Sequence, residues 1–148
     1  MRPAPTAWIL ALALVGVVRV AHADDKVDCS YLEISATNGK SPSIDPELKR
    51  LDNKLKHPPF SSWNTFHKLS GGDFALVKLK AEALKLKQGA ASVLLRERSD
   101  KKAELTITAD GPDGKRVIDT KVSLAFGDWL PIVNNVGDDG HILALTCK

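Results

Sequence analysis

Residues 103–126 constrain the fold more than any other part of the sequence, because they have the pattern of a β-hairpin. Apolar residues occupy the odd positions from Ala103 to Ala109, which is the alternation of a strand with one buried face. A turn-forming stretch, DGPDG, follows at positions 110–114. A second alternating run then places apolar residues and a threonine on the even positions from Ile118 to Phe126. The pattern predicts a fold built from antiparallel strands.

Short segments with strand character recur along the rest of the chain. They occupy residues 27–36, 64–69, 92–98, 129–133 and 142–147. Pro131 donates no backbone hydrogen bond, so its strand is expected at the edge of a sheet. Seven or eight strands at this spacing predict a mainly β fold, either an antiparallel β-sandwich or a flattened barrel.

One short amphipathic helix is expected near the N-terminus of this domain. Asp45 is placed to cap it, and Pro46 suits the first turn, where a missing N–H costs nothing. Leucines then recur at helical spacing, at Leu48, Leu51 and Leu55. Pro58 disfavours helical geometry at the residue before it, so the helix should end near Lys56. The leucines are expected to pack on the sheet; a partner helix from another chain is the alternative.

Residues 74–88 carry two conflicting signals. Their alanine, leucine, lysine and glutamate content favours a helix. However, apolar residues and lysines alternate strictly at 77–80 and again at 84–87, and on a helical wheel the lysines fall on two sides. We therefore predict a strand with a bulge or bend near residues 81–83.

The N-terminal residues 1–23 resemble a secretory signal peptide. Arg2 precedes an apolar run, and the sequence AHA at positions 21–23 fits a cleavage site. The apolar run is shorter than the roughly 20 residues that cross a bilayer, which argues against the alternative of an uncleaved anchor. Residues 24–148 then form a single domain without a transmembrane segment. The protein is expected to be exported, either to a periplasm or to the extracellular space.

The two cysteines, Cys29 and Cys147, lie near opposite ends of the expected mature chain. An even number of cysteines in an exported protein favours a disulfide, with two buried free thiols as the alternative. A disulfide requires the first and last strands to be close neighbours.

Positive charge is concentrated in residues 76–102. The whole chain carries a formal net charge of +3, and the expected signal peptide accounts for two of its arginines, so nucleic acid is not an expected partner. The candidate binding residues in this segment are Lys78, Lys80, Lys85, Lys87, Arg96 and Arg98. On strands they form a basic face suited to an anionic envelope component or an acidic protein. The alternative is that they protect a sheet edge from aggregation.

Residues 57–69 hold three large aromatic side chains, Phe60, Trp63 and Phe66. They form either an aromatic platform for a sugar or peptide, or part of the core.

No sequence motif indicates catalysis, a metal site or a cofactor. The histidines have no second ligand at metal-binding spacing, and no G-x-S-x-G motif is present. The Asp pairs at 110/113 and 138/139 do not match an EF-hand and are interpreted as turn residues rather than Ca²⁺ ligands. The sequence therefore favours a non-enzymatic binding or structural module of the cell envelope or extracellular space. A small secreted hydrolase without a recognisable motif is the alternative.

Overall fold

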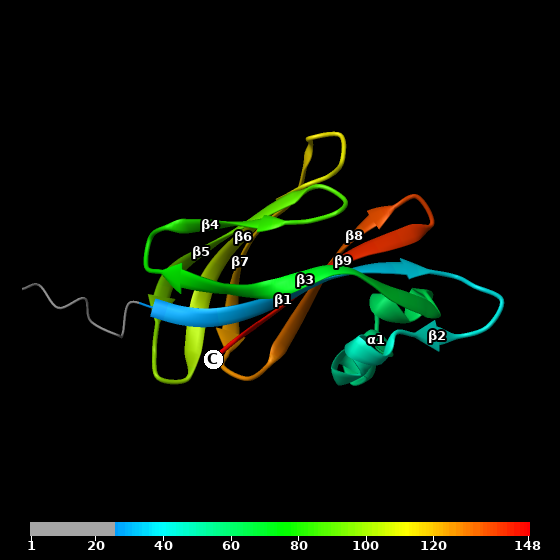
Figure 1. Cartoon of the computed structure of the whole chain (residues 1–148), viewed down its shortest axis with the longest axis horizontal. Helices are drawn as coiled ribbons and strands as arrows, with labels where there is room; N and C mark the ends of the chain where they lie inside the picture. The colour runs from blue at the N-terminus through cyan, green and yellow to red at the C-terminus, as the bar shows by residue number, and fades with distance from the viewer. Residues whose placement is uncertain (1–25) are drawn as a thin grey trace, which may run out of the picture.

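The computed structural model describes residues 26–148, and these form two β-sheets packed face to face (Figure 1). The larger sheet has the strand order β2-β3-β1-β9-β8, and the smaller has the order β4-β5-β6-β7. The strands are β1 (Lys26–Thr37), β2 (Ser43–Ile44), β3 (Thr65–Val77), β4 (Ala81–Lys85), β5 (Ala90–Arg98), β6 (Lys102–Asp110), β7 (Arg116–Ala125), β8 (Trp129–Val136) and β9 (Asp139–Cys147). Apart from the parallel β2–β3 pair, neighbouring strands are antiparallel. The structure is thus a β-sandwich; the expected signal peptide lies outside the described residues.

The expected hairpin forms β6 and β7. The odd-numbered residues of β6 from Ala103 to Ala109 are buried between the sheets. The turn closes through the N–H of Gly111, which donates to the carbonyl oxygen of Lys115, and Gly114 adopts a positive φ of 78°. On β7, by contrast, only Leu124 is fully buried, because this strand is the edge of the smaller sheet.

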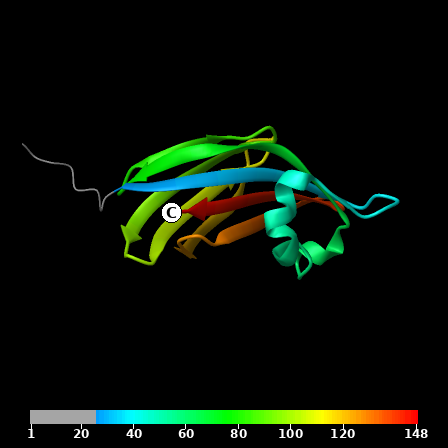
Figure 2. The same ribbon diagram turned by 60° about the horizontal axis from the view of Figure 1, so that its bottom comes forward.

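The larger sheet is covered on one face by the smaller sheet and over part of its other face by helices. From β1, Val27 and Cys29 pack against the smaller sheet. Leu32, Ile34 and Ala36 instead face a helical segment made of η2 (Pro46–Leu51), α1 (Asp52–Leu55) and η3 (Phe60–Ser62). Figure 2 shows this segment lying across β1 and β9. Two hydrophobic cores result, one on each side of the larger sheet.

The predicted helix is present, but most of it is a 3₁₀ helix. Its three leucines are buried, which confirms the predicted apolar stripe, and α1 ends at Leu55 close to the predicted end. Asp45 is the N-cap residue, as predicted, but its side chain makes no capping hydrogen bond. Its carboxylate instead accepts a hydrogen bond from the backbone N–H of Lys68 at 2.8 Å and contacts Nδ1 of His67 at 2.9 Å. Both partners belong to β3, so the carboxylate binds this strand and not the start of the helix. These contacts lower the pKa of Asp45, with the His67 hydrogen bond as the main cause.

Within residues 74–88, residues 74–77 and 81–85 are strand, as the alternation predicts, but the chain reverses earlier than expected. The break falls at residues 78–80, where Leu79 has a φ of 63°, and the chain passes there from the larger sheet to the smaller one. The stretch at 81–83, where a bulge or bend was predicted, is regular strand in β4.

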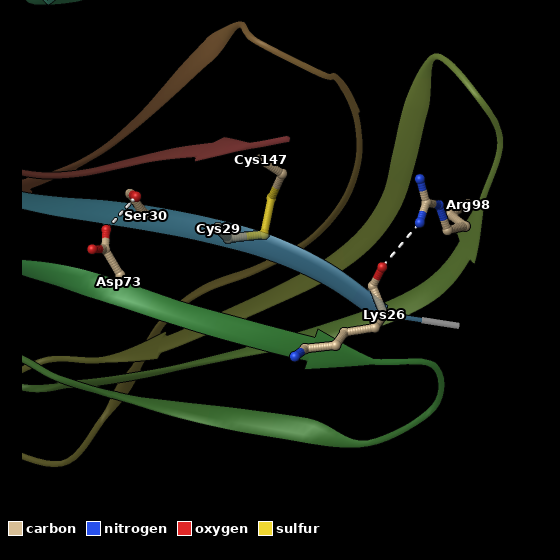
Figure 3. The surroundings of a disulfide bond; sticks show 6 residues. All are labelled: Lys26, Cys29, Ser30, Asp73, Arg98 and Cys147. Atoms are coloured by element: carbon tan, nitrogen blue, oxygen red, sulfur yellow. Dashed lines mark hydrogen bonds between the residues drawn. A yellow bond between two sulfur atoms is a disulfide. The ribbon is translucent and has the colours of Figure 1, made fainter. Parts of the chain in front are cut away.

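The predicted disulfide joins Cys29 to Cys147, which lie directly opposite each other on β1 and β9 (Figure 3). The first and last strands are therefore adjacent, as predicted. Pro131 lies in β8, which is an edge strand, also as predicted. Among residues 26–148, no helix is long and apolar enough to cross a membrane.

Candidate functional site

A pocket of about 400 Å³ opens between the helical segment and the β2 edge of the larger sheet. Its lining includes the apolar residues Pro42, Ile44, Leu55, Trp63 and Phe66 and the polar residues Ser43, Asp52, Lys56, Ser61 and Asn64. We call this hollow the Trp63 pocket. It combines a largely apolar wall with a few polar groups, which is the usual composition of a small-molecule site.

The Trp63 side chain is held in one position from two sides. Its Nε1 donates a hydrogen bond of 2.8 Å to the backbone oxygen of Asp138. On the other side its ring lies close to Gly140, where an added Cβ would approach the ring carbon Cη2 to 2.8 Å. Only glycine leaves room for the ring at this contact, so this wall of the pocket is formed before any ligand arrives.

The charged part of the lining is an ion pair on the helical segment. Lys56 Nζ lies 2.8 Å from a carboxylate oxygen of Asp52, one helical turn away. The Asn64 side chain is already used, because it exchanges two hydrogen bonds with the backbone of Gly39. Ser61 is exposed. A ligand would thus meet one positive charge, one negative charge and the exposed hydroxyls of Ser43 and Ser61 beside the apolar wall.

The three aromatic residues of the candidate platform lie in the core beside this pocket. Phe60, Trp63 and Phe66 are 8%, 8% and 6% exposed, and all three belong to the hydrophobic core under the helical segment. They do not form an open aromatic face. Trp63 and Phe66 contribute to the pocket wall, so two of the three remain accessible to a small ligand.

Three of the six candidate basic residues have partners within the protein. Lys78 forms an ion pair with Glu97 at 3.1 Å, and Arg96 lies 3.8 Å from Glu104. Arg98 points the other way, because a bulge in β5 between Leu95 and Glu97 changes the alternation. Its guanidinium donates to the backbone oxygen of Lys26 in the larger sheet (Figure 3) and lies over the ring of Phe126.

The other three candidate residues, Lys80, Lys85 and Lys87, are exposed along β4 and its flanking turns. Their side chains form no ion pair with any part of residues 26–148. The structure therefore divides the six residues into three with partners inside the protein and three unpaired lysines along the edge strand β4; of the first three, Lys78 and Arg96 lie beside an acidic side chain and Arg98 does not.

A buried polar cluster around Glu33 was not predicted. Glu33 is fully buried on β1, and four groups bind its carboxylate: Ser70 Oγ at 2.6 Å, the N–H of Lys87 at 2.7 Å, the N–H of Gln88 at 2.9 Å and His141 Nε2 at 2.7 Å. Burial alone would raise the pKa of Glu33, but these hydrogen bonds outweigh it and lower the pKa below its usual value. Glu33 thereby ties the loop after β4 to the larger sheet.

The order of contacts in this cluster differs from that of a hydrolytic triad. In a triad the histidine lies between the nucleophile and the carboxylate and takes the proton of the nucleophile. Here the carboxylate lies in the middle, so Ser70 donates to Glu33 and not to His141. None of the three lines the Trp63 pocket. The arrangement suits a structural tie between the sheets.

Within residues 26–148, no group of three or more histidine, cysteine, aspartate or glutamate side chains is arranged to hold a metal ion. Comparisons of the chain with models of protein families, with curated proteins and with solved structures found no match.

Proposed function

We propose that the protein is an exported, non-enzymatic binding module that holds a small amphipathic ligand in the Trp63 pocket. The observation that carries this proposal is the pocket itself, with Trp63 and Phe66 in its wall and the Asp52–Lys56 ion pair beside them. The Cys29–Cys147 disulfide supports a place of action in an oxidising compartment, such as a periplasm or the extracellular space.

The chemistry of the pocket suggests what the ligand must offer. An apolar group, aromatic or branched aliphatic, would pack against Trp63, Phe66 and Leu55. A polar or charged group on the same ligand would reach Lys56 or the Ser61 hydroxyl. The volume of about 400 Å³ lies toward the small end of typical ligand pockets, which span roughly 300–1,000 Å³. The ligand is therefore a small molecule or a single side chain of a peptide.

The probe 1-anilinonaphthalene-8-sulfonate tests the pocket, because it carries an aromatic apolar body and one negative charge. The protein is expected to enhance its fluorescence. Ser61→Phe should abolish the enhancement by filling the pocket, since Ser61 lines it without belonging to the core. Ser62→Phe is the matched control, because Ser62 is an exposed neighbour outside the lining. Equal enhancement by both variants, or none by the parent protein, refutes the proposal.

A second contact, with an anionic partner, is supported by the three unpaired lysines along β4. Lys80, Lys85 and Lys87 present an unneutralised positive edge that would attract acidic lipid headgroups. The test is sedimentation with phosphatidylglycerol vesicles at low and high salt. Reversing the three lysines to glutamate should abolish binding, and salt should weaken binding of the parent protein.

The matched control for this second contact reverses three exposed lysines elsewhere, Lys49, Lys54 and Lys115. Equal loss of vesicle binding in both triple variants would indicate an effect of net charge alone. Binding that persists after reversal at β4 would assign the three lysines to edge protection.

A further inference from the structure

The outer edge of β7 is a long strand edge without a partner strand in residues 26–148. On the larger sheet, β2 and the Asp45 carboxylate occupy part of the β3 edge, and Pro131 interrupts the β8 edge. On the smaller sheet, β4 has five residues, whereas β7 has ten and contains no proline. Unpaired backbone groups on such an edge are a template for pairing with another strand.

The side chains at the centre of β7 carry unmatched charge and half-buried apolar surface. Asp119 and Lys121 are exposed on the outer face, and neither forms an ion pair within the described part of the chain. On the inner face, Ile118 and Val122 contact the core but stay partly exposed. Thr120 lies between them at the midpoint.

We propose that β7 pairs with β7 of a second copy in an antiparallel contact whose two-fold axis passes beside Thr120. Thr120 then faces Thr120 of the other copy, Ile118 faces Val122, and Asp119 faces Lys121. Residues directly opposite each other on antiparallel strands have Cβ atoms about 5 Å apart, close enough for these pairs to interact. The two four-stranded sheets become one continuous sheet.

The charges select this register over its neighbours. Side chains alternate between the two faces of a strand, and residues directly opposite each other in an antiparallel pair lie on the same face. The two-fold axis must therefore pass beside a residue, which then faces its own copy. Centring on Asp119 would place the two Asp119 carboxylates together, and centring on Lys121 would place the two ammonium groups together. The register centred on Thr120 converts both unpaired charges of each copy into opposite-charge pairs. The second copy is thus the partner that this edge complements.

The contact is independent of the Trp63 pocket. The pocket lies beside the larger sheet and the helical segment, whereas β7 belongs to the smaller sheet. A failure to form the dimer therefore leaves the proposal of ligand binding unaffected, and a failure to bind the ligand leaves the proposal of the dimer unaffected.

Sedimentation velocity on the purified protein, over a wide range of concentration, tests the dimer with a charge swap. Asp119→Lys sets lysine against lysine, and Lys121→Asp sets aspartate against aspartate, so each variant alone should sediment as a monomer. The double variant restores opposite charges and should dimerise again. An equimolar mixture of the two single variants should form a heterodimer, because both cross-strand pairs are then complementary.

Both positions are exposed, so the variants are expected to keep the circular dichroism spectrum and melting temperature of the parent protein. Lys49→Asp, on the exposed side of the helical segment, is the matched control and should leave the dimer unchanged. A parent protein that stays monomeric up to its solubility limit overturns the proposal. Dimers that persist in both single variants, or single variants that do not associate when mixed, overturn it equally.

Discussion

Replacement of Glu33 by glutamine tests whether the buried carboxylate ties the loop after β4 to the larger sheet. One carboxylate oxygen accepts Ser70 Oγ and the N–H of Lys87, and the other contacts the N–H of Gln88 and His141 Nε2. Glutamine has a single oxygen, so its NH₂ group must face at least one of these backbone N–H donors. In either orientation of the amide, one backbone N–H, that of Lys87 or that of Gln88, faces the NH₂ group.

The expected cost combines two effects. One of the two backbone N–H groups loses its acceptor, and a buried unsatisfied donor costs about 1–3 kcal/mol. The hydrogen bonds that remain lose the charge of the acceptor, and charge-assisted bonds exceed neutral ones by about 1 kcal/mol. Together these effects predict that the free energy of unfolding falls by about 3 kcal/mol. For a domain of this size that corresponds to a drop of about 10 °C in the melting temperature.

The direction of the Glu33 pKa shift determines how the stability contributed by Glu33 depends on pH. The pKa of Glu33 is lowered in the folded protein, so its contribution is complete above the unfolded value of about 4.3 and is lost as pH falls through the folded value. Urea unfolding should therefore show the full difference between the parent protein and Glu33→Gln at pH 7. The difference should shrink at pH values below about 4.3.

Ser70→Ala provides the comparison for this experiment. It removes one donor but leaves every backbone N–H with its acceptor, so it should cost about 1 kcal/mol. If Glu33→Gln lowers the free energy of unfolding by less than Ser70→Ala, or if its effect does not diminish in acid, the reasoning is refuted.

Loss of the disulfide in a Cys29→Ala/Cys147→Ala variant should lower the free energy of unfolding by about 4 kcal/mol, because the bond closes a loop spanning 118 positions. Urea unfolding measures this loss, and a loss below about 1 kcal/mol would contradict the loop argument. Gly140→Ala should lower the free energy of unfolding by about 1–3 kcal/mol, because its Cβ would lie 2.8 Å from the Trp63 ring. It should also alter the near-ultraviolet circular dichroism of that ring. An unchanged spectrum and stability would show that the ring moves freely. Leu79→Asn should raise the free energy of unfolding by about 0.5 kcal/mol, because Leu79 is 71% exposed and has a positive φ that asparagine tolerates better. Thermal melting detects this gain in stability. A loss of stability would mean that the leucine side chain stabilises the turn.

The parts of the fold that were predictable from sequence depend on short-range patterns. The alternation in residues 103–126 and the turn between its two runs specify a hairpin without reference to the rest of the chain. The cysteine pair places β1 beside β9 because a covalent bond demands it. Residues 74–88 were harder, since composition and alternation disagreed there. Alternation predicted the strands, but the reversal at Leu79 requires a positive φ that a leucine does not signal.

The helical segment shows where local reasoning misleads. The signals at Asp45 and Pro46 mark a helix start correctly, yet the Asp45 carboxylate binds β3 instead of capping the helix. Nothing within the segment itself shows that a backbone N–H of Lys68 needs an acceptor. The Asp45 carboxylate binds β3, which is distant in the sequence, and is therefore not free to cap the helix.

The candidate sites were less predictable because their residues come from distant segments. The four groups that bind Glu33 lie 37 to 108 positions away from it. Leu32 and Ile34 on either side make Glu33 look like the solvent-facing residue of an alternating strand. From Leu32 to Ile34 both faces of β1 are covered, so alternation there does not separate inside from outside. The Trp63 pocket likewise depends on how the helical segment packs.

The position of the disulfide also determines how the domain responds to tension. A force that pulls on the backbone at Lys26 and Lys148 reaches Cys29 and Cys147 after at most three residues on either side, and the covalent bond then carries it directly between them. The Cα atoms of the two cysteines are 4.0 Å apart, so the loaded path is short and cannot lengthen by unravelling the strands in between. A module anchored at both ends would act as an inextensible link. Its two sheets and the Trp63 pocket would stay unstrained while the load passes beside them.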